Sequence, residues 1–186
     1  GLGAGGVAAL YNWLLGIAHQ GMTENFRMNR LLMWIQPENY SSGIGYQTVQ
    51  GLYAIGSGGL FGKGLGKSLQ KLGFIPESQN DMIFSIICEE LGLFGAMCII
   101  LVFALMLWRI IHIAQNAPDL FGTMLAAGVF AHVAVQVVLN IAVVTNFIPN
   151  TGVSLPFISY GGTASFFLLL EMGIVLNISS KIRLER

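Results

Sequence analysis

The sequence predicts an all-α integral membrane protein, a polytopic bundle with about five transmembrane helices. Hydrophobic residues make up 54% of the 186 residues and charged residues only 10%, whereas charged residues make up roughly a quarter of a soluble domain. The few charges are also grouped, and long apolar stretches separate the groups. This alternation is typical of a chain that crosses a bilayer several times.

The charge-free stretches give the positions of the predicted helices. Asp, Glu, Lys and Arg are absent before Glu24 and from the intervals between Glu38 and Lys63, Glu90 and Arg109, and Asp119 and Glu171. A bilayer crossing needs roughly 20 mostly apolar residues, so we expect transmembrane helices at 1–19, 43–58, 84–111, 120–145 and 161–180. The last interval holds two helices because "NFIPNTGVSLP" contains two prolines and a glycine, which interrupt a helix.

The basic residues predict the orientation, because Lys and Arg favour cytoplasmic loops. With a cytoplasmic C-terminus, six of them lie inside, namely Arg27, Arg30, Arg109, Lys181, Arg183 and Arg186, and three lie outside, namely Lys63, Lys67 and Lys71. We therefore expect one membrane domain over 1–186, with a cytoplasmic connector at 20–42 and extracytoplasmic loops at 59–83 and 146–160. Two interpretations of the connector stay open: an interfacial helix, or a linker with snorkelling side chains.

Several classes of function are excluded by composition and spacing. A net charge of zero argues against a nucleic-acid partner. Cys88 and Cys98 are ten positions apart with no histidine nearby, so we interpret both as buried helix residues without a metal or redox role. The stretch "GSGGLFGKGLGKSLQK" does not satisfy the P-loop pattern, because Gly64 follows Lys63 where Ser or Thr is required. The chain starts without Met and without a signal peptide, so we expect the C-terminal part of a longer protein.

Four of the nine acidic residues gather in one short stretch, "IPESQNDMIFSIICEELG", at Glu77, Asp81, Glu89 and Glu90. In the predicted orientation this stretch lies where a helix enters the membrane from outside. A carboxylate at Asp81 can act as a general base there, and Gln79 and Asn80 can orient a polar ligand by hydrogen bonds. The alternative is that Asp81 only caps the helix that follows it.

Glu89 and Glu90 lie further along the same predicted helix, where a charge in hydrocarbon is costly unless it is paired or hydrated. One interpretation is that one of them lines a cavity with Asp81. The other is a structural ion pair with a loop lysine. Adjacent helical residues point about 100° apart, so we expect a structural role for at least one of the two.

The sequence closely resembles the SEDS family of FtsW, RodA and SpoVE proteins. The resemblance is carried by "GYQTVQGLYAIGSGGLFGKGLGKSLQKLGFIPESQNDMIFSIICEELGLFG" and then "IPNTGVSLPFISYGG", in the family's order, and runs from about Arg27 to Arg183. One departure is that "PESQNDMIF" stands where the family usually has "PEAHTDFIF". Gln79 and Asn80 thus replace a His-Thr pair, while Asp81 is kept.

The resemblance implies a ten-helix membrane glycosyltransferase of which this chain supplies the last five helices. Its expected reaction is polymerisation of the lipid-linked disaccharide precursor, lipid II, at the outer face of the bacterial cytoplasmic membrane. An inverting mechanism and a prenyl-pyrophosphate-linked donor are expected, with Asp81 as the essential base. The expected partners are a class B penicillin-binding protein and the divisome or elongation complex. No cofactor is evident, although a divalent cation is possible if the other half supplies some of its ligands.

The substrate-binding residues expected from this resemblance come from both outer loops. They are Lys63, Lys67, Gln79, Asn80 and Glu89 around Asp81, and Thr151, Ser154, Ser159 and Tyr160 in the second loop. A lysine facing the donor pyrophosphate would offset its charge, but solvated loop lysines fit the same spacing. The second loop could equally be a rigid re-entrant turn in which Ser159 caps the last helix.

A polar stripe in the fourth predicted helix supports an alternative class of function. His132, Gln136 and Asn140 recur every four residues and so share one face of a helix, and Glu171 belongs to the same layer. Hydrogen bonds between helices explain such a stripe, and a proton relay is the second explanation. The relay would suit a transporter, or flippase, of the lipid-linked precursor. A noncatalytic scaffold for a penicillin-binding partner is a third possibility.

Overall fold

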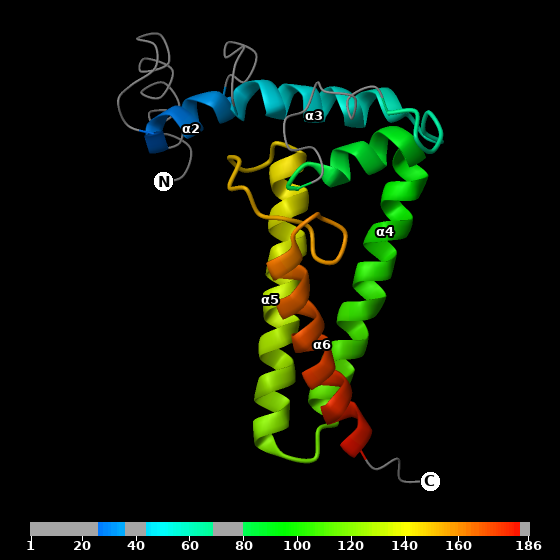
Figure 1. The fold of residues 1–186 in the computed structure, drawn as a ribbon, viewed down its shortest axis with the longest axis vertical. Coiled ribbons are helices and arrows are strands. Elements are labelled where there is room, and N and C mark those ends of the chain that lie inside the picture. The colour runs from blue at the N-terminus through cyan, green and yellow to red at the C-terminus, as the bar shows by residue number, and fades with distance from the viewer. Residues whose placement is uncertain (1–25, 36–43, 69–79, 183–186) are drawn as a thin grey trace, which may run out of the picture.

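The computed structural model describes residues 26–35, 44–68 and 80–182, and all regular structure within them is helical. The elements are α2 (Phe26–Ile35), α3 (Ile44–Gly58), α4 (Ile83–Gln115), α5 (Leu120–Val144) and α6 (Gly162–Lys181). Figure 1 shows α2, α3 and the start of α4 lying across one end of a bundle formed by the rest of α4, α5 and α6. We name this end the Asp81 end and the opposite one the Lys181 end.

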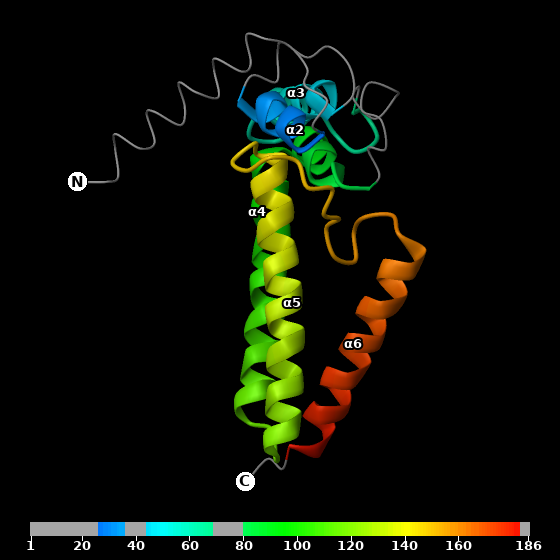
Figure 2. The ribbon, with the colours of Figure 1, turned by 90° about the vertical axis from the view of Figure 1, so that its left-hand side faces the viewer.

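Among the described residues, three helices are long and apolar enough to cross a membrane, and they confirm the predicted spans at 84–111, 120–145 and 161–180. They are α4, α5 and α6, with 33, 25 and 20 residues. α4 packs along α5, and α6 diverges from this pair towards the Asp81 end (Figure 2). Asp119 caps α5 by accepting a hydrogen bond from Gly122 N (3.3 Å). The predicted span at 1–19 lies outside the described residues.

The predicted transmembrane helix at 43–58 is wrong. α3 has 15 residues, so it is about 22 Å long, whereas the hydrocarbon core is about 30 Å thick. It lies across the end of the bundle instead of along it (Figure 1). The lack of charge between Glu38 and Lys63 was misleading, because glycine and uncharged polar residues fill much of this interval.

α2, the described part of the connector predicted at 20–42, lies at the same end of the bundle as the 146–160 loop, so the two cannot lie on opposite sides of the membrane as predicted. Trp34 Nε1 in α2 donates a hydrogen bond to Asn146 O (3.0 Å), and Asn146 Nδ2 donates to Trp34 O (3.4 Å). Both segments therefore lie at the Asp81 end. The predicted crossing by α3, which would have put α2 on the other side of the membrane, is absent. With Arg27 and Arg30 moved to that end, the count of basic residues changes from six against three to four against five, and it no longer supports the orientation.

α4 is broken at Gly92, which has φ 70° and ψ −169°. Residues 83–91 run across the Asp81 end, and residues 93–115 then descend beside α5 (Figure 1). A break of this kind frees backbone amides and carbonyls that a continuous helix would pair. Close to a membrane those groups need other protein partners.

The loop after α3 supplies these partners. We name the contact between residues 58–64 and 89–94 the glycine interlock. Its four backbone hydrogen bonds run from Lys63 N to Glu89 O (2.9 Å), Gly64 N to Glu90 O (2.9 Å), Leu93 N to Gly59 O (2.9 Å) and Phe94 N to Leu60 O (3.2 Å). The loop thus pairs the carbonyls before the break and the amides after it.

The two backbones approach so closely that only glycine fits at three positions of the interlock. A Cβ atom would lie 1.9 Å from Cys88 O at Gly58, 2.2 Å from Glu90 O at Gly62, and 2.3 Å from Gly62 N at Gly92. Gly62 and Gly92 also have positive φ angles, which side-chain-bearing residues rarely adopt.

We therefore expect Gly92→Ala to destabilise the full-length protein by about 2 kcal/mol or more, from backbone strain and overpacking together. Gly128→Ala in α5 is the matched control, because a Cβ there meets nothing within 4 Å. Thermal unfolding in detergent measures both variants. Equal melting temperatures for Gly92→Ala and Gly128→Ala would contradict the interlock.

Candidate functional site

Three segments hold Asp81 in the turn that precedes α4. Gln47 Nε2 of α3 donates a hydrogen bond to Asp81 Oδ1 (3.0 Å). Asn140 Nδ2 of α5 donates both to Asp81 O (2.9 Å) and to Val153 O (2.7 Å). Asn140 is fully buried, so its amide fixes the backbone of Asp81 to the loop between α5 and α6. Asp81 itself is only half-buried.

Asp81 is not the residue that caps α4, so the capping prediction is wrong. The N-cap position belongs to Met82, which makes no side-chain capping hydrogen bond. Asn80 lies beside Asp81 in the same turn and is half-buried. Gln79, predicted to bind substrate with Asn80, lies outside the described residues.

An open depression of about 450 Å³ lies next to this turn. Its lining comes from the start of α4 and from the segment that leads into α6, namely Ile83, Ile158, Ser159, Tyr160, Gly161, Gly162 and Ser165. Ile83 is two positions after Asp81, and Tyr160 is exposed. A space of this size, with the hydroxyl groups of Ser159, Tyr160 and Ser165 in its lining, can admit part of a polar ligand.

The polar residues predicted in the second loop divide into two kinds. Thr151 and Tyr160 are exposed and available to a ligand. Ser154 and Ser159 bond within the fold: Ser154 Oγ accepts a long hydrogen bond from Gln136 Nε2 (3.5 Å), and Ser159 Oγ accepts from Leu155 N (2.7 Å). The prediction that Ser159 caps α6 is wrong, since Gly161 occupies that position without a side-chain cap.

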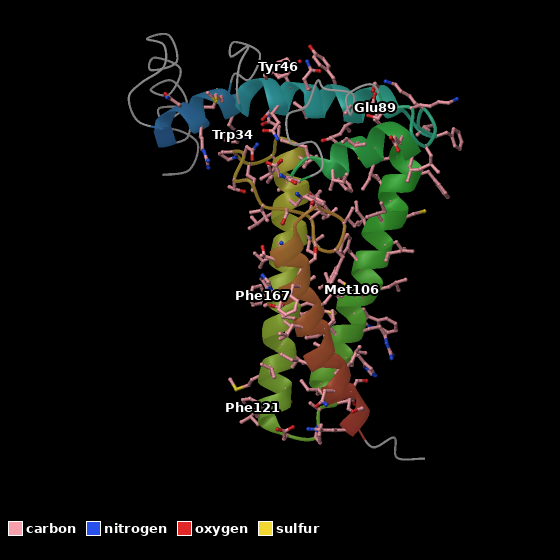
Figure 3. The ribbon with its side chains drawn as sticks, in the orientation of Figure 1. Trp34, Tyr46, Glu89, Met106, Phe121 and Phe167 are labelled. Carbon is pink, nitrogen blue, oxygen red and sulfur yellow. The ribbon has the colours of Figure 1, made fainter. Side chains whose placement is uncertain are left out.

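Glu89 forms the buried ion pair that was one of its two predicted roles. Its carboxylate is 0% exposed and lies 2.7 Å from Lys63 Nζ. Ser68 Oγ donates to Oε2 (2.5 Å), and Ser57 Oγ donates to Oε1 (3.4 Å). Figure 3 shows Glu89 where the end of α3 meets the bend in α4. The fold covers its carboxylate completely, so the contacts of Glu89 in this structure are with protein groups.

One of the two predicted lysines is held in a protein contact, and the other is exposed. Lys63 is engaged with Glu89, which lies six positions after Ile83, the first residue of α4, and therefore about 9 Å further along the helix. Lys67 is exposed and forms no ion pair within the described ranges. Lys63 thus has a structural contact, and Lys67 is the predicted cation that remains open to a ligand.

Glu90 Oε1 is buried and has no hydrogen-bond partner among the described residues.

The polar stripe of α5 makes one of the predicted contacts between helices, from His132, while Gln136 and Asn140 bond mainly to a loop. Gln136 and Asn140 bond to the loop before α6, and His132 Nδ1 lies 3.0 Å from Glu171 Oε2 of α6. Asn140 additionally reaches the Asp81 turn. The stripe therefore connects the candidate site to the transmembrane helices.

The cysteines and the acidic residues do not form a metal site in the part of the chain that the structure describes. No three His, Cys, Asp or Glu side chains lie close enough there to hold an ion together. A divalent cation thus stays a prediction. Cys88 is buried as expected, but Cys98 is exposed on α4, so its predicted burial is wrong.

Comparison with known proteins identifies the family. The sequence matches the FtsW, RodA and SpoVE family of cell cycle proteins over residues 6–184. The chain belongs to this family. It is 46% identical over 166 residues to the stage V sporulation protein E of Bacillus subtilis, covering 89% of this chain and 45% of that protein.

Other similar proteins are named as probable peptidoglycan glycosyltransferases. A probable peptidoglycan glycosyltransferase FtsW of Trichlorobacter lovleyi is 44% identical over 159 residues, covering 86% of this chain and 42% of the relative. The chain therefore spans less than half the length of these curated relatives. The same glycosyltransferase name belongs to an FtsW of Bacillus subtilis, 44% identical over 153 residues, with 82% of this chain and 38% of the relative covered.

Solved structures confirm the fold. A structure described as "Structural coordination of polymerization and crosslinking by a peptidoglycan synthase complex" superimposes with a TM-score of 0.67 at 24% identity, covering 97% of this chain and 49% of the other. A crystal structure of the rod shape determining protein RodA of Thermus thermophilus gives a TM-score of 0.55 at 23% identity, with 92% and 64% covered. The all-helical membrane fold is thus shared within the family.

Sequence reasoning missed one residue of the candidate site, Gln47. Its side chain donates a hydrogen bond to the Asp81 carboxylate, although the sequence predicts a transmembrane helix over this interval. The signal was present, because "GYQ" opens the first block that resembles the family. A glutamine next to a family motif should have been considered as a partner of Asp81.

The ion pair leads to a prediction with a matched control. Lys63→Ala leaves the buried Glu89 carboxylate without its cation, so we expect a loss of stability of about 3 kcal/mol. Lys67→Ala removes an exposed cation from the same loop and should change stability by less than about 0.5 kcal/mol. Thermal unfolding of the full-length variants in detergent compares them, and similar losses for the two would contradict the structural role of Lys63.

Proposed function

We propose that the full-length protein is a peptidoglycan glycosyltransferase that polymerises lipid-linked disaccharide precursors, and that Asp81 is its general base. The observation that carries the proposal is the position of Asp81. Its carboxylate is held by Gln47 in the turn before α4, and the lining of an open depression begins two positions later, at Ile83. The glycosyltransferase names of the relatives point to the same chemistry.

In the proposed reaction Asp81 accepts the proton of the acceptor sugar's hydroxyl as its oxygen attacks the anomeric carbon of the donor. The bond from that carbon to the prenyl pyrophosphate breaks, and the configuration inverts. Lys67 is the exposed cation that could offset charge on the departing pyrophosphate. Thr151 and Tyr160 offer hydroxyl groups to the sugars from the second loop, and Asn80 offers an amide beside Asp81.

The proposed location is the bacterial cytoplasmic membrane, with the Asp81 end outside and the C-terminus in the cytoplasm. The count of basic residues does not support this orientation, but the chemistry of the proposed reaction does. A polymerase that builds an external glycan needs its base at the outer surface, and every loop that carries a candidate substrate-binding residue lies at the Asp81 end.

The proposed partner is a class B penicillin-binding protein within the divisome or the elongation complex. One structural neighbour is described as a synthase complex that coordinates polymerisation with crosslinking. Crosslinking of new glycan strands requires a transpeptidase close to the polymerase. A partnership of this kind supplies both activities at one place.

The direct test is polymerisation of labelled lipid II by the purified full-length protein with its partner. We expect Asp81→Asn to keep the melting temperature and lose polymer formation, because the amide retains the shape of the side chain but cannot accept the proton. Asp119→Asn is the matched control: it removes a carboxylate from the Lys181 end, and Asn caps a helix as well as Asp does.

A second candidate function, transport of the precursor, is favoured by the His132–Glu171 pair, because titratable residues within a membrane span often belong to a transport pathway. His132→Gln separates the two functions in the same preparation. If the protein is a polymerase, the variant should polymerise at near the wild-type rate. If it is a proton-coupled carrier, the variant should lose transport of the precursor. Loss of precursor flipping in His132→Gln liposomes, together with full polymerisation by Asp81→Asn, would favour the carrier.

A further inference from the structure

The loop between α3 and α4 exposes three large apolar side chains. Leu60 is 65% exposed, Phe61 85% and Leu65 77%. Their loop was expected to face water outside the membrane, where so much exposed apolar surface in one short segment would be unfavourable. We name these three residues the loop tip.

The glycine interlock fixes the position of the loop tip relative to α4. Leu60 O accepts from Phe94 N and Gly59 O accepts from Leu93 N, so the loop tip begins beside the first residues of the straight part of α4. Exposed apolar side chains then continue from the loop tip along α4, namely Leu93, Phe94, Met97, Leu101, Val102, Leu105 and Trp108. The loop tip is thus continuous with a membrane-spanning apolar surface.

The depth of this contact can be estimated along α4. Leu93 lies sixteen positions before Arg109, which corresponds to about 24 Å of helix. Arg109 and the exposed Trp108 have the side chains expected at a membrane interface. Because the hydrocarbon core is about 30 Å thick, Leu93 and the neighbouring loop tip lie at the depth of the acyl chains on the Asp81 side.

We propose that the loop tip inserts into the lipid leaflet at the Asp81 end and anchors the α3–α4 loop in the membrane interface. The exposed Lys67 follows two positions after Leu65, so its amine can reach the headgroup phosphates while the loop tip contacts acyl chains. The continuity with α4 makes lipid the occupant of this surface. The proposal does not depend on the reaction that the protein catalyses.

Depth-dependent fluorescence quenching of the full-length protein in phosphatidylcholine–phosphatidylglycerol nanodiscs tests the proposal. An environment-sensitive dye is attached at Phe61→Cys, and separately at Leu65→Cys, after Cys98 and any other reactive cysteine have been replaced. Met97→Cys on α4 is the control for lipid contact. Thr151→Cys, in the other loop at the same end, is the control for water contact.

We expect the dye at positions 61 and 65 to emit at shorter wavelength than at 151. Quenching by lipids that carry a nitroxide near the headgroup should be severalfold stronger than at 151, and quenching by aqueous iodide severalfold weaker. Iodide quenching equal to that at 151 would place the loop tip in water and overturn the proposal. Protection from iodide that appears only when the transpeptidase is co-purified would also overturn it, because the surface would then bind protein.

Discussion

A transmembrane helix that breaks near the bilayer surface must find protein partners for the backbone groups that the break frees. This constraint is met at Gly92, where four hydrogen bonds from the α3–α4 loop pair the carbonyls before the break and the amides after it. The approach is so close that Gly58, Gly62 and Gly92 leave no room for a Cβ atom. The Lys63–Glu89 ion pair then neutralises the one carboxylate that the contact buries completely.

The position of the candidate site follows from this contact. Because α4 bends at Gly92, its first segment runs across the end of the bundle and brings Asp81 towards the end of α5, where Asn140 holds its backbone. α3 lies alongside and supplies Gln47 to the carboxylate. A straight α4 would carry Asp81 away from both residues. The bend, the loop and the two amides therefore act together to place one carboxylate at the end of the bundle.

The long spans could be predicted because hydrocarbon excludes charge over the whole length of α4, α5 and α6. The same criterion failed for α3, since a helix that lies across the bundle also needs no charge. That error put Arg27 and Arg30 at the end of the bundle opposite the 146–160 loop, whereas α2 lies beside that loop. In the site, Asp81 was predicted from its charge and its motif, but its contact with Gln47 joins positions 34 apart, and no sequence period reports such a contact.

Glu89 and Ser159 show that the sequence alone does not identify the partner of a polar side chain. Both were predicted to bind substrate because their side chains are polar and close to the motif. In the fold, Glu89 pairs with Lys63, and Ser159 accepts a hydrogen bond from its own loop. A buried polar group needs a partner, but the sequence does not show whether a protein atom or a ligand supplies it.

Hydrogen exchange of the Lys63 and Gly64 amides in the full-length protein is the most direct test of the central claim, that the glycine interlock fixes the segment that carries Asp81. Both amides lie in a loop without regular secondary structure, yet each donates to a carbonyl of α4 at 2.9 Å. We predict that they exchange as slowly as amides inside the helices. Exchange as fast as that of the exposed Thr151 amide would contradict the account.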